Sequence, residues 1–150
     1  MRAIEAFLAA PPYQACLLLV HADPARLGAA VAAVGVRYGR PAWALGRSLG
    51  PRLLDHAPAD RPAVAVAGLS EAVAAHAPGP VLISDIPLLF EPTLRLDPLR
   101  LLRDAARRAP LLVAWPGAVE GDRLVYAVAG HAHYRSWPLT DLCPTCVIPL

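Results

Sequence analysis

Residues 16–28 have the sequence CLLLVHADPARLG, and this stretch decides the fold class. Its first five residues are apolar and have no helical period, which is typical of a strand buried on both faces of a sheet. Asp23 is a preferred N-cap residue and Pro24 suits the first position of a helix, so we expect a helix from Pro24 to about Val36. The stretch therefore predicts a buried strand, a tight turn and a helix.

The same alternation continues along the chain. Residues 81–85, which are apolar up to Ile83 and end in Asp85, and the apolar run at 111–115 predict two more buried strands. Asp97 with Pro98 repeats the cap-and-proline pattern before a helix that ends near Arg108. Strands that alternate with helices predict an α/β fold of three layers, in which helices flank a mostly parallel sheet, with residues 1–150 as one domain. The remaining predicted elements are helices at 2–10, 47–55 and 65–76, a loop at 60–63, strands at 41–45 and 147–150, and an edge strand at 123–128 in a hairpin that turns at 120–122.

Composition narrows the class of protein. Hydrophobic residues make up 56% of the chain, well above the range of disordered proteins. No apolar run approaches the ~18 residues of a membrane-spanning helix, and Glu5 and Pro11 interrupt the N-terminal apolar stretch before it could serve as an export signal. We therefore expect a soluble, cytoplasmic protein without membrane contact, with its three cysteines reduced.

The predicted turn at residues 21–23 lies where a phosphate-binding loop would lie in a P-loop nucleotide-binding fold. Such a loop needs glycines, a lysine for the phosphate oxygens and a serine or threonine for magnesium. Leu27 and Gly28 occupy the positions of the lysine and the hydroxyl residue, and all 14 basic residues of the chain are arginine. We therefore expect a fold related to that of the P-loop NTPases without nucleotide hydrolysis. Two interpretations of the turn stay open: a capped turn without a ligand, or an anion held at the helix N-terminus with help from Arg26.

Asp85 ends the second predicted buried strand, as the magnesium-binding aspartate of a Walker B strand does. Ile86 follows it where an active ATPase commonly has a catalytic glutamate, so no general base is evident and we assign no catalytic residue. The candidate nucleotide-binding residues are His21, Asp23, Arg26 and Asp85. ATP with magnesium is the cofactor that they would bind, and the missing lysine and hydroxyl argue against it.

Four segments carry a resemblance to a known family: residues 83–92 (ISDIPLLFEP), 96–102 (LDPLRLL), 112–117 (LVAWPG) and 130–135 (GHAHYR). They resemble BrxF, the small P-loop-containing protein of type 3 BREX (bacteriophage exclusion) defence systems. Members of that family carry an ordinary Walker A loop, from which this chain departs at Leu27 and Gly28. The resemblance implies a P-loop-like fold with a degenerate Walker A loop and a role in phage defence. It also implies other BREX proteins as partners, with DNA contacted through them.

Arginines recur along one face of the predicted helix at 97–108. Leu99, Leu102 and Ala106 mark the opposite face, which we expect to pack against the core. The basic stripe fits an acidic partner surface or a phosphate backbone, and ordinary solvated arginines explain it equally well. The residues of this candidate surface are Arg100, Arg103, Arg107 and Arg108.

A CxxC pair formed by Cys143 and Cys146 lies near the end of the sequence. His131 and His133 precede it, so a zinc site with two histidine and two cysteine ligands is one interpretation. The tandem spacing of common zinc sites is missing, and the other interpretation is two buried thiols in a terminal strand.

Three functional hypotheses follow from these residues. The first is a non-hydrolysing P-loop-like accessory protein of a phage-defence system that acts through partners. The second is a small NTPase with an unusual loop that uses Arg26 and Asp85. The third is an interaction module stabilised by zinc. Trp115 and Trp137 either join the histidines in a binding surface or pack in the core.

Overall fold

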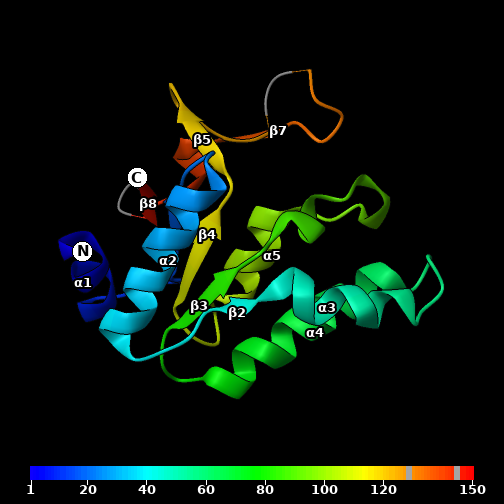
Figure 1. Ribbon diagram of the computed structural model, residues 1–150, viewed down its shortest axis with the longest axis horizontal. Coiled ribbons are helices and arrows are strands. Elements are labelled where there is room, and N and C mark those ends of the chain that lie inside the picture. Colours follow the sequence, from blue (N-terminus) through cyan, green and yellow to red (C-terminus); the bar gives the residue numbers. More distant parts are fainter. Residues whose placement is uncertain (128–129, 144–145) are drawn as a thin grey trace.

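The computed structural model describes residues 1–127, 130–143 and 146–150. In this part of the chain, five parallel strands form one sheet in the order β2-β3-β4-β1-β8, and three antiparallel strands form a second sheet in the order β5-β6-β7 (Figure 1). The strands are β1 (Cys16–Val20), β2 (Trp43–Ala44), β3 (Val81–Ser84), β4 (Leu111–Trp115), β5 (Gly117–Glu120), β6 (Arg123–Tyr126), β7 (Arg135–Pro138) and β8 (Val147–Pro149). The helices are α1 (Arg2–Ala9), α2 (Pro24–Tyr38), α3 (Leu45–Leu54), α4 (Arg61–His76) and α5 (Pro98–Ala105), with short 3₁₀ helices η1 (Pro87–Phe90), η2 (Pro92–Leu94) and η3 (Leu139–Asp141).

Helices cover both faces of the parallel sheet. Successive side chains of a strand point to opposite faces, so Leu17 and Leu19 of β1 share a core with α1 and α2, whereas Leu18 and Val20 share a core with α3, α4 and α5. Figure 1 shows the resulting layers, with α1 and α2 on one side of the sheet and the other three helices beyond it. The predicted α/β fold with a mostly parallel sheet flanked by helices is confirmed.

Strands β1 and β4 lie side by side, but the chain leaves them in opposite directions. From β1 it passes through α2 to β2, at one edge of the sheet, and from β4 it passes through the small sheet to β8, at the other edge. Ligands of open α/β sheets bind at such a switch point, outside the carboxyl ends of the strands. The turn after β1 lies at this place, so the fold positions it where a ligand is expected.

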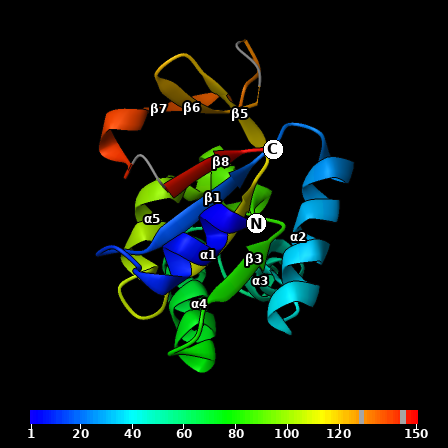
Figure 2. The same ribbon diagram turned by 90° about the vertical axis from the view of Figure 1, so that its left-hand side faces the viewer.

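The small sheet lies beyond the carboxyl end of β4 (Figure 2). Trp115, the last residue of β4, is fully buried and its indole Nε1 donates a hydrogen bond of 3.0 Å to the carbonyl of Val125 in β6. Its ring meets those of Phe90 and Trp137 edge-to-face, at centroid distances of 5.1 and 5.2 Å. Trp115 and Trp137 therefore pack in the core that joins the two sheets, as one of the two sequence interpretations predicted.

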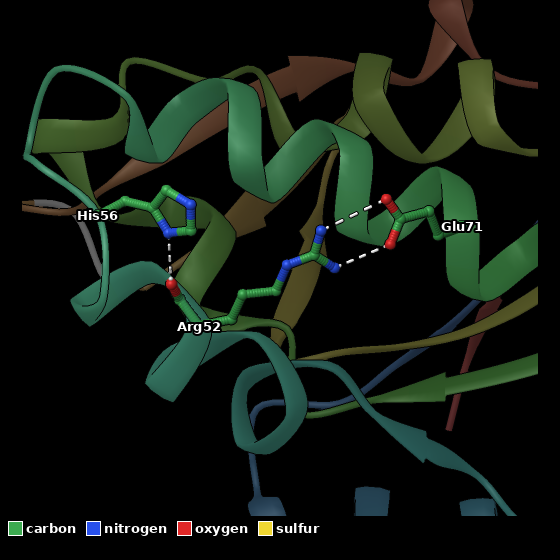
Figure 3. Close-up of polar contacts among 3 residues, drawn as sticks. All are labelled: Arg52, His56 and Glu71. Carbon is green, nitrogen blue, oxygen red and sulfur yellow. Dashed lines mark hydrogen bonds and ion pairs between the residues drawn. The ribbon is translucent and has the colours of Figure 1, made fainter.

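Helices α3 and α4 pack closely against each other. A Cβ atom at Gly68 would lie 2.5 Å from Leu49 Cδ2, so a larger residue here would require the end of the Leu49 side chain to move. Figure 3 shows a second contact, in which the Arg52 guanidinium of α3 meets the Glu71 carboxylate of α4 through two hydrogen bonds of 2.9 and 3.3 Å. The same figure shows His56 Nδ1 2.9 Å from the carbonyl oxygen of Arg52. The Arg52 hydrogen bonds and charge lower the pKa of the Glu71 carboxyl.

Both edges of the parallel sheet are short. Strand β2 has two residues and follows Pro41, and β8 has three residues that end at Pro149. Proline has no amide hydrogen, which is why it is found on sheet edges and not in central strands.

Several element boundaries differ from the sequence prediction. The expected loop at 60–63 is wrong, because α4 already begins at Arg61 with Pro62 in its first turn, a position that tolerates proline. Helix α5 ends at Ala105, so the predicted extension to Arg108 is a turn. The predicted strand at 123–128 ends at Tyr126, and residue 128 lies outside the described residues. This strand is the centre of the small sheet and not an edge, since β7 pairs with its other side.

Candidate functional site

The turn between β1 and α2 is held by its own side chains. His21 Nδ1 accepts a hydrogen bond of 2.8 Å from the amide of Asp23, and Asp23 Oδ1 accepts one of 2.9 Å from the amide of Ala25. Asp23 therefore caps α2, as its type and position predicted. The turn has three residues and no glycine, so it is much shorter than a loop that wraps around phosphates.

The N-terminus of α2 has few amides left for an anion. Pro24 has no amide hydrogen, and the amides of Ala25 and Leu27 both donate to Asp23, to its side chain and its carbonyl respectively. Arg26 is exposed, and its amide is the one first-turn donor for which the described contacts give no acceptor. The positive end of the helix dipole is thus already matched by the Asp23 carboxylate.

Backbone hydrogen bonds hold the neighbouring strands together at the switch point. The amide of His21 donates a hydrogen bond of 3.2 Å to the carbonyl of Trp115, which continues the pairing of β1 and β4 by one residue beyond the strands. The amide of Leu150 donates to the carbonyl of Val20 at 3.0 Å on the other side of β1. Backbone bonds therefore occupy the place where the strands would otherwise separate.

Asp85 lies just after β3 with a positive φ of 55°, in the left-handed region. Its Oδ2 accepts a hydrogen bond of 2.8 Å from the amide of Arg47, and its carbonyl accepts one of 2.8 Å from the amide of Gly46. Both donors are in the first turn of α3, whose own N-cap residue, Ala44, has no capping side chain. Asp85 therefore supplies the cap that α3 lacks. A Cβ atom at Gly46 would lie 2.8 Å from Asp85 Oδ2, so glycine makes this approach possible.

The four arginines of the predicted basic stripe have different surroundings. Leu99, Leu102 and Ala106 are buried, which confirms the packed face of α5. Arg103 is partly buried and its Nη1 donates a hydrogen bond of 2.8 Å to the carbonyl of Asp141 in η3, so this arginine is not a freely solvated one. The remaining members of the stripe, Arg100, Arg107 and Arg108, are exposed, and Arg107 lies 3.5 Å from Asp104 in an ion pair.

The histidines and cysteines of the predicted zinc site lie in separate turns. The rings of His131 and His133 are 5.4 Å apart, and His131 Nδ1 accepts a hydrogen bond from the amide of His133. Cys146 is buried and Cys143 is exposed, so the alternative of two buried thiols in a strand is wrong for Cys143, and both residues precede β8. Among the described residues, no three or more histidine, cysteine or acidic side chains are grouped to hold a metal ion.

The third cysteine, Cys16, begins β1 and is buried in the core between β1 and the helices α3 to α5. Burial, together with the nearby thiol of Cys146, raises the pKa of the Cys16 thiol to about 12. A thiol is nucleophilic as its thiolate, so Cys16 is an inert core residue at neutral pH.

A groove that the sequence did not predict lies between α4 and α5. Its lining includes Val66 and Leu101 as well as Arg107 and Arg108. The alanine-rich sequence of α4 has no strong amphipathic pattern, and a pattern in one helix does not show which helix lies beside it. No signal in the sequence would have placed these residues together.

The chain matches no protein-family model, no curated protein and no solved structure. In the described part of the chain, no helix has both the length and the apolar character needed to span a membrane.

Proposed function

We propose that this chain is a non-hydrolysing, P-loop-like accessory protein of a prokaryotic anti-phage defence system of the BREX type. It acts in the cytoplasm by binding other proteins of that system, with DNA contacted through them. The resemblance of residues 81–135 to BrxF supports the defence role. The parallel sheet, with its strand–turn–helix unit at a switch point, supports the P-loop-like ancestry.

The β1–α2 turn is the observation that carries the non-hydrolysing part of the proposal. Proton transfer and phosphate binding need donors, a cation and a base at this place. His21 and Asp23 instead bond to the backbone of the turn, and Asp85 uses a carboxylate oxygen to cap α3. The lysine and the hydroxyl residue are missing from the sequence as well. The local structure thus supports a P-loop-like fold in which capping hydrogen bonds occupy the place of the phosphate site.

A nucleotide assay tests this part. Purified full-length chain should release no phosphate from ATP or GTP above background with magnesium, and a large excess of either nucleotide should leave its melting temperature unchanged, since a ligand that binds the native state raises it. The exposed side chain of Arg26 provides the decisive variant because Arg26→Ala should not disturb the fold. Turnover that disappears in Arg26→Ala at unchanged stability would establish a working NTPase instead.

A phage challenge tests the defence part. Deleting the gene in its native host should lower protection, measured as the plating efficiency of phages that the host normally resists. Both the wild-type gene and Arg26→Ala should restore protection, because the proposed role needs no nucleotide. Unchanged plating after the deletion would contradict a role in defence.

A further inference from the structure

Positive charge is concentrated in α5 and the turn that follows it. Residues 98–108, which comprise α5 and the turn after it, contain four arginines and one aspartate. Their net charge of +3 exceeds the +2 of the whole chain, so the rest of the molecule is slightly acidic. The one acidic residue, Asp104, is already in an ion pair with Arg107.

A groove of about 240 Å³ lies between α4 and α5, and two of the four arginines, Arg107 and Arg108, line it. Its apolar surface comes from both helices, and Val66 of α4 is 41% exposed, one of the large apolar side chains left open on the surface. Leu101 of α5 is partly buried beside it. Arg107 and Arg108 line the same groove together with Asp104, which pairs with Arg107, and all three are exposed. Apolar surface and a net positive charge therefore lie side by side.

We propose that this groove binds an acidic amphipathic helix of a partner protein. Apolar residues of that helix contact Val66 and Leu101, and its carboxylates pair with Arg107 and Arg108. Grooves between two helices are a recurrent docking place for a third helix that presents apolar residues at i, i+3, i+4 and i+7. Arginine suits this pairing because its planar guanidinium binds carboxylates through two hydrogen bonds. This inference rests on the proposed function, since it names the chemistry of the partner.

Charge and shape favour an acidic peptide over nucleic acid at this groove. A phosphate backbone is held by several cations in a row, whereas two arginines line this groove and one of them, Arg107, already pairs with Asp104. The other two arginines of this segment, Arg100 and Arg103, line a different pocket, where the carboxylates of Asp97 and Asp141 lie beside them.

Fluorescence anisotropy tests the proposal with a defined probe. The probe is a labelled peptide of about 16 residues with leucine at i, i+3, i+4 and i+7 and glutamate at most other positions. Full-length protein should bind it, and binding should weaken as salt is raised from ~50 to ~300 mM. Arg107→Glu with Arg108→Glu should weaken binding by roughly tenfold or more, and Val66→Ser should weaken it with little change in salt dependence.

A matched control carries the same change of charge elsewhere. Arg2→Glu with Arg26→Glu alters two exposed arginines on α1 and α2, which cover the opposite face of the sheet, and should leave peptide binding close to wild type. Melting temperatures of all variants confirm that they are folded. The proposal is overturned if the peptide does not bind, if both double variants weaken binding equally, or if a DNA duplex or a lysine version of the peptide binds better. None of these results changes the outcome of the nucleotide and phage assays. Failure of the peptide-binding proposal can therefore be distinguished from failure of the proposed function.

Discussion

Asp85 Oδ2 accepts a 2.8 Å hydrogen bond from the backbone amide of Arg47, a residue 38 positions earlier in the chain. The bond joins the end of β3 to the start of α3, where Ala44 cannot cap the helix itself. A negative charge at this end of the helix also matches the helix dipole. The acidic residue that most resembles a magnesium ligand in the sequence thus has a structural role in the folded chain.

We expect Asp85→Ala to lower the free energy of unfolding by about 1–2 kcal/mol, the usual cost of losing a helix cap. Asp85→Asn keeps an acceptor oxygen and should cost less. Urea unfolding followed by circular dichroism measures both. Asp55→Ala is the control, because this exposed carboxylate follows α3 and makes no side-chain hydrogen bond to the described residues. Equal stability of Asp85→Ala and Asp55→Ala would contradict the capping role.

Gly117→Ala should destabilise the join between the two sheets. A Cβ atom at this position would collide with the carbonyl oxygen of Val125 and lie 2.9 Å from the indole nitrogen of Trp115. Overpacking of this kind costs roughly 1–3 kcal/mol of unfolding free energy. The fluorescence maximum of the buried Trp115 should also shift to longer wavelength. Gly28→Ala should instead leave stability unchanged or raise it by up to about 1 kcal/mol, because that glycine is in α2 with open space around it. If Gly117→Ala is as stable as the wild type, β5 and β6 can move apart at this position and the expected collision is wrong.

Cys16 should resist alkylation in the native protein. Burial and the Cys146 thiol raise the pKa of the Cys16 thiol from 9.0 to about 12, so the thiol stays protonated at pH 8. The side chain is also enclosed by the core, so iodoacetamide should modify it only after unfolding. Mass spectrometry of the peptide that contains Cys16 measures this. Rapid modification under native conditions would contradict its burial.

The same raised pKa predicts a dependence of stability on pH. An unfolded thiol ionises near pH 9 and the folded one near pH 12, so the contribution of Cys16 is complete below pH 9 and is lost as pH rises between these values. Cys16→Ala should flatten the alkaline branch of the stability profile. An unchanged branch would mean that other groups cause the loss.

Arg103→Glu should cost more stability than Arg100→Glu. Arg103 is partly buried and bonds to the carbonyl of Asp141, which ties α5 to η3, whereas Arg100 is exposed. Removing the first side chain loses one hydrogen bond at the surface, with a net contribution of about 1 kcal/mol, while an exposed charge contributes little. Thermal unfolding of the two single variants compares them. Equal melting temperatures of the two variants would contradict this role and indicate that Arg103 is an ordinary solvated arginine.

Local patterns predicted the fold well wherever one residue type fixes a backbone state. The apolar runs of β1 and β4 and the Asp-Pro starts of α2 and α5 appear as expected, because burial and capping are properties of the segment itself. Strand β7 was missed because its residues become a strand only by pairing with β6. The start of α4 was missed because a proline near Asp60 suits both a loop and a helical first turn.

The candidate site was predicted less completely, and distance along the chain explains why. The cap formed by Asp23 acts within two residues, so its residue type predicted it. The hydrogen bond from the Asp23 amide to His21 was not predicted, since His21 was a candidate nucleotide-binding residue. The bonds of Asp85 to α3 and of Arg103 to η3 connect segments that no local pattern relates. The groove between α4 and α5 likewise depends on how two helices cross, which is a property of the packed molecule.

The two short, proline-flanked edges of the parallel sheet affect how the protein behaves in a crowded solution. An open edge that presents a row of amide and carbonyl groups is a template for another chain, and repeated addition leads to cross-β aggregates. Two residues in β2, and three in β8 of which the last lacks an amide hydrogen, give an incoming strand little to pair with. Self-assembly by strand addition is therefore disfavoured at both ends of the sheet. Recognition by other molecules is left to side chains, which can discriminate between partners in a way that a bare backbone cannot.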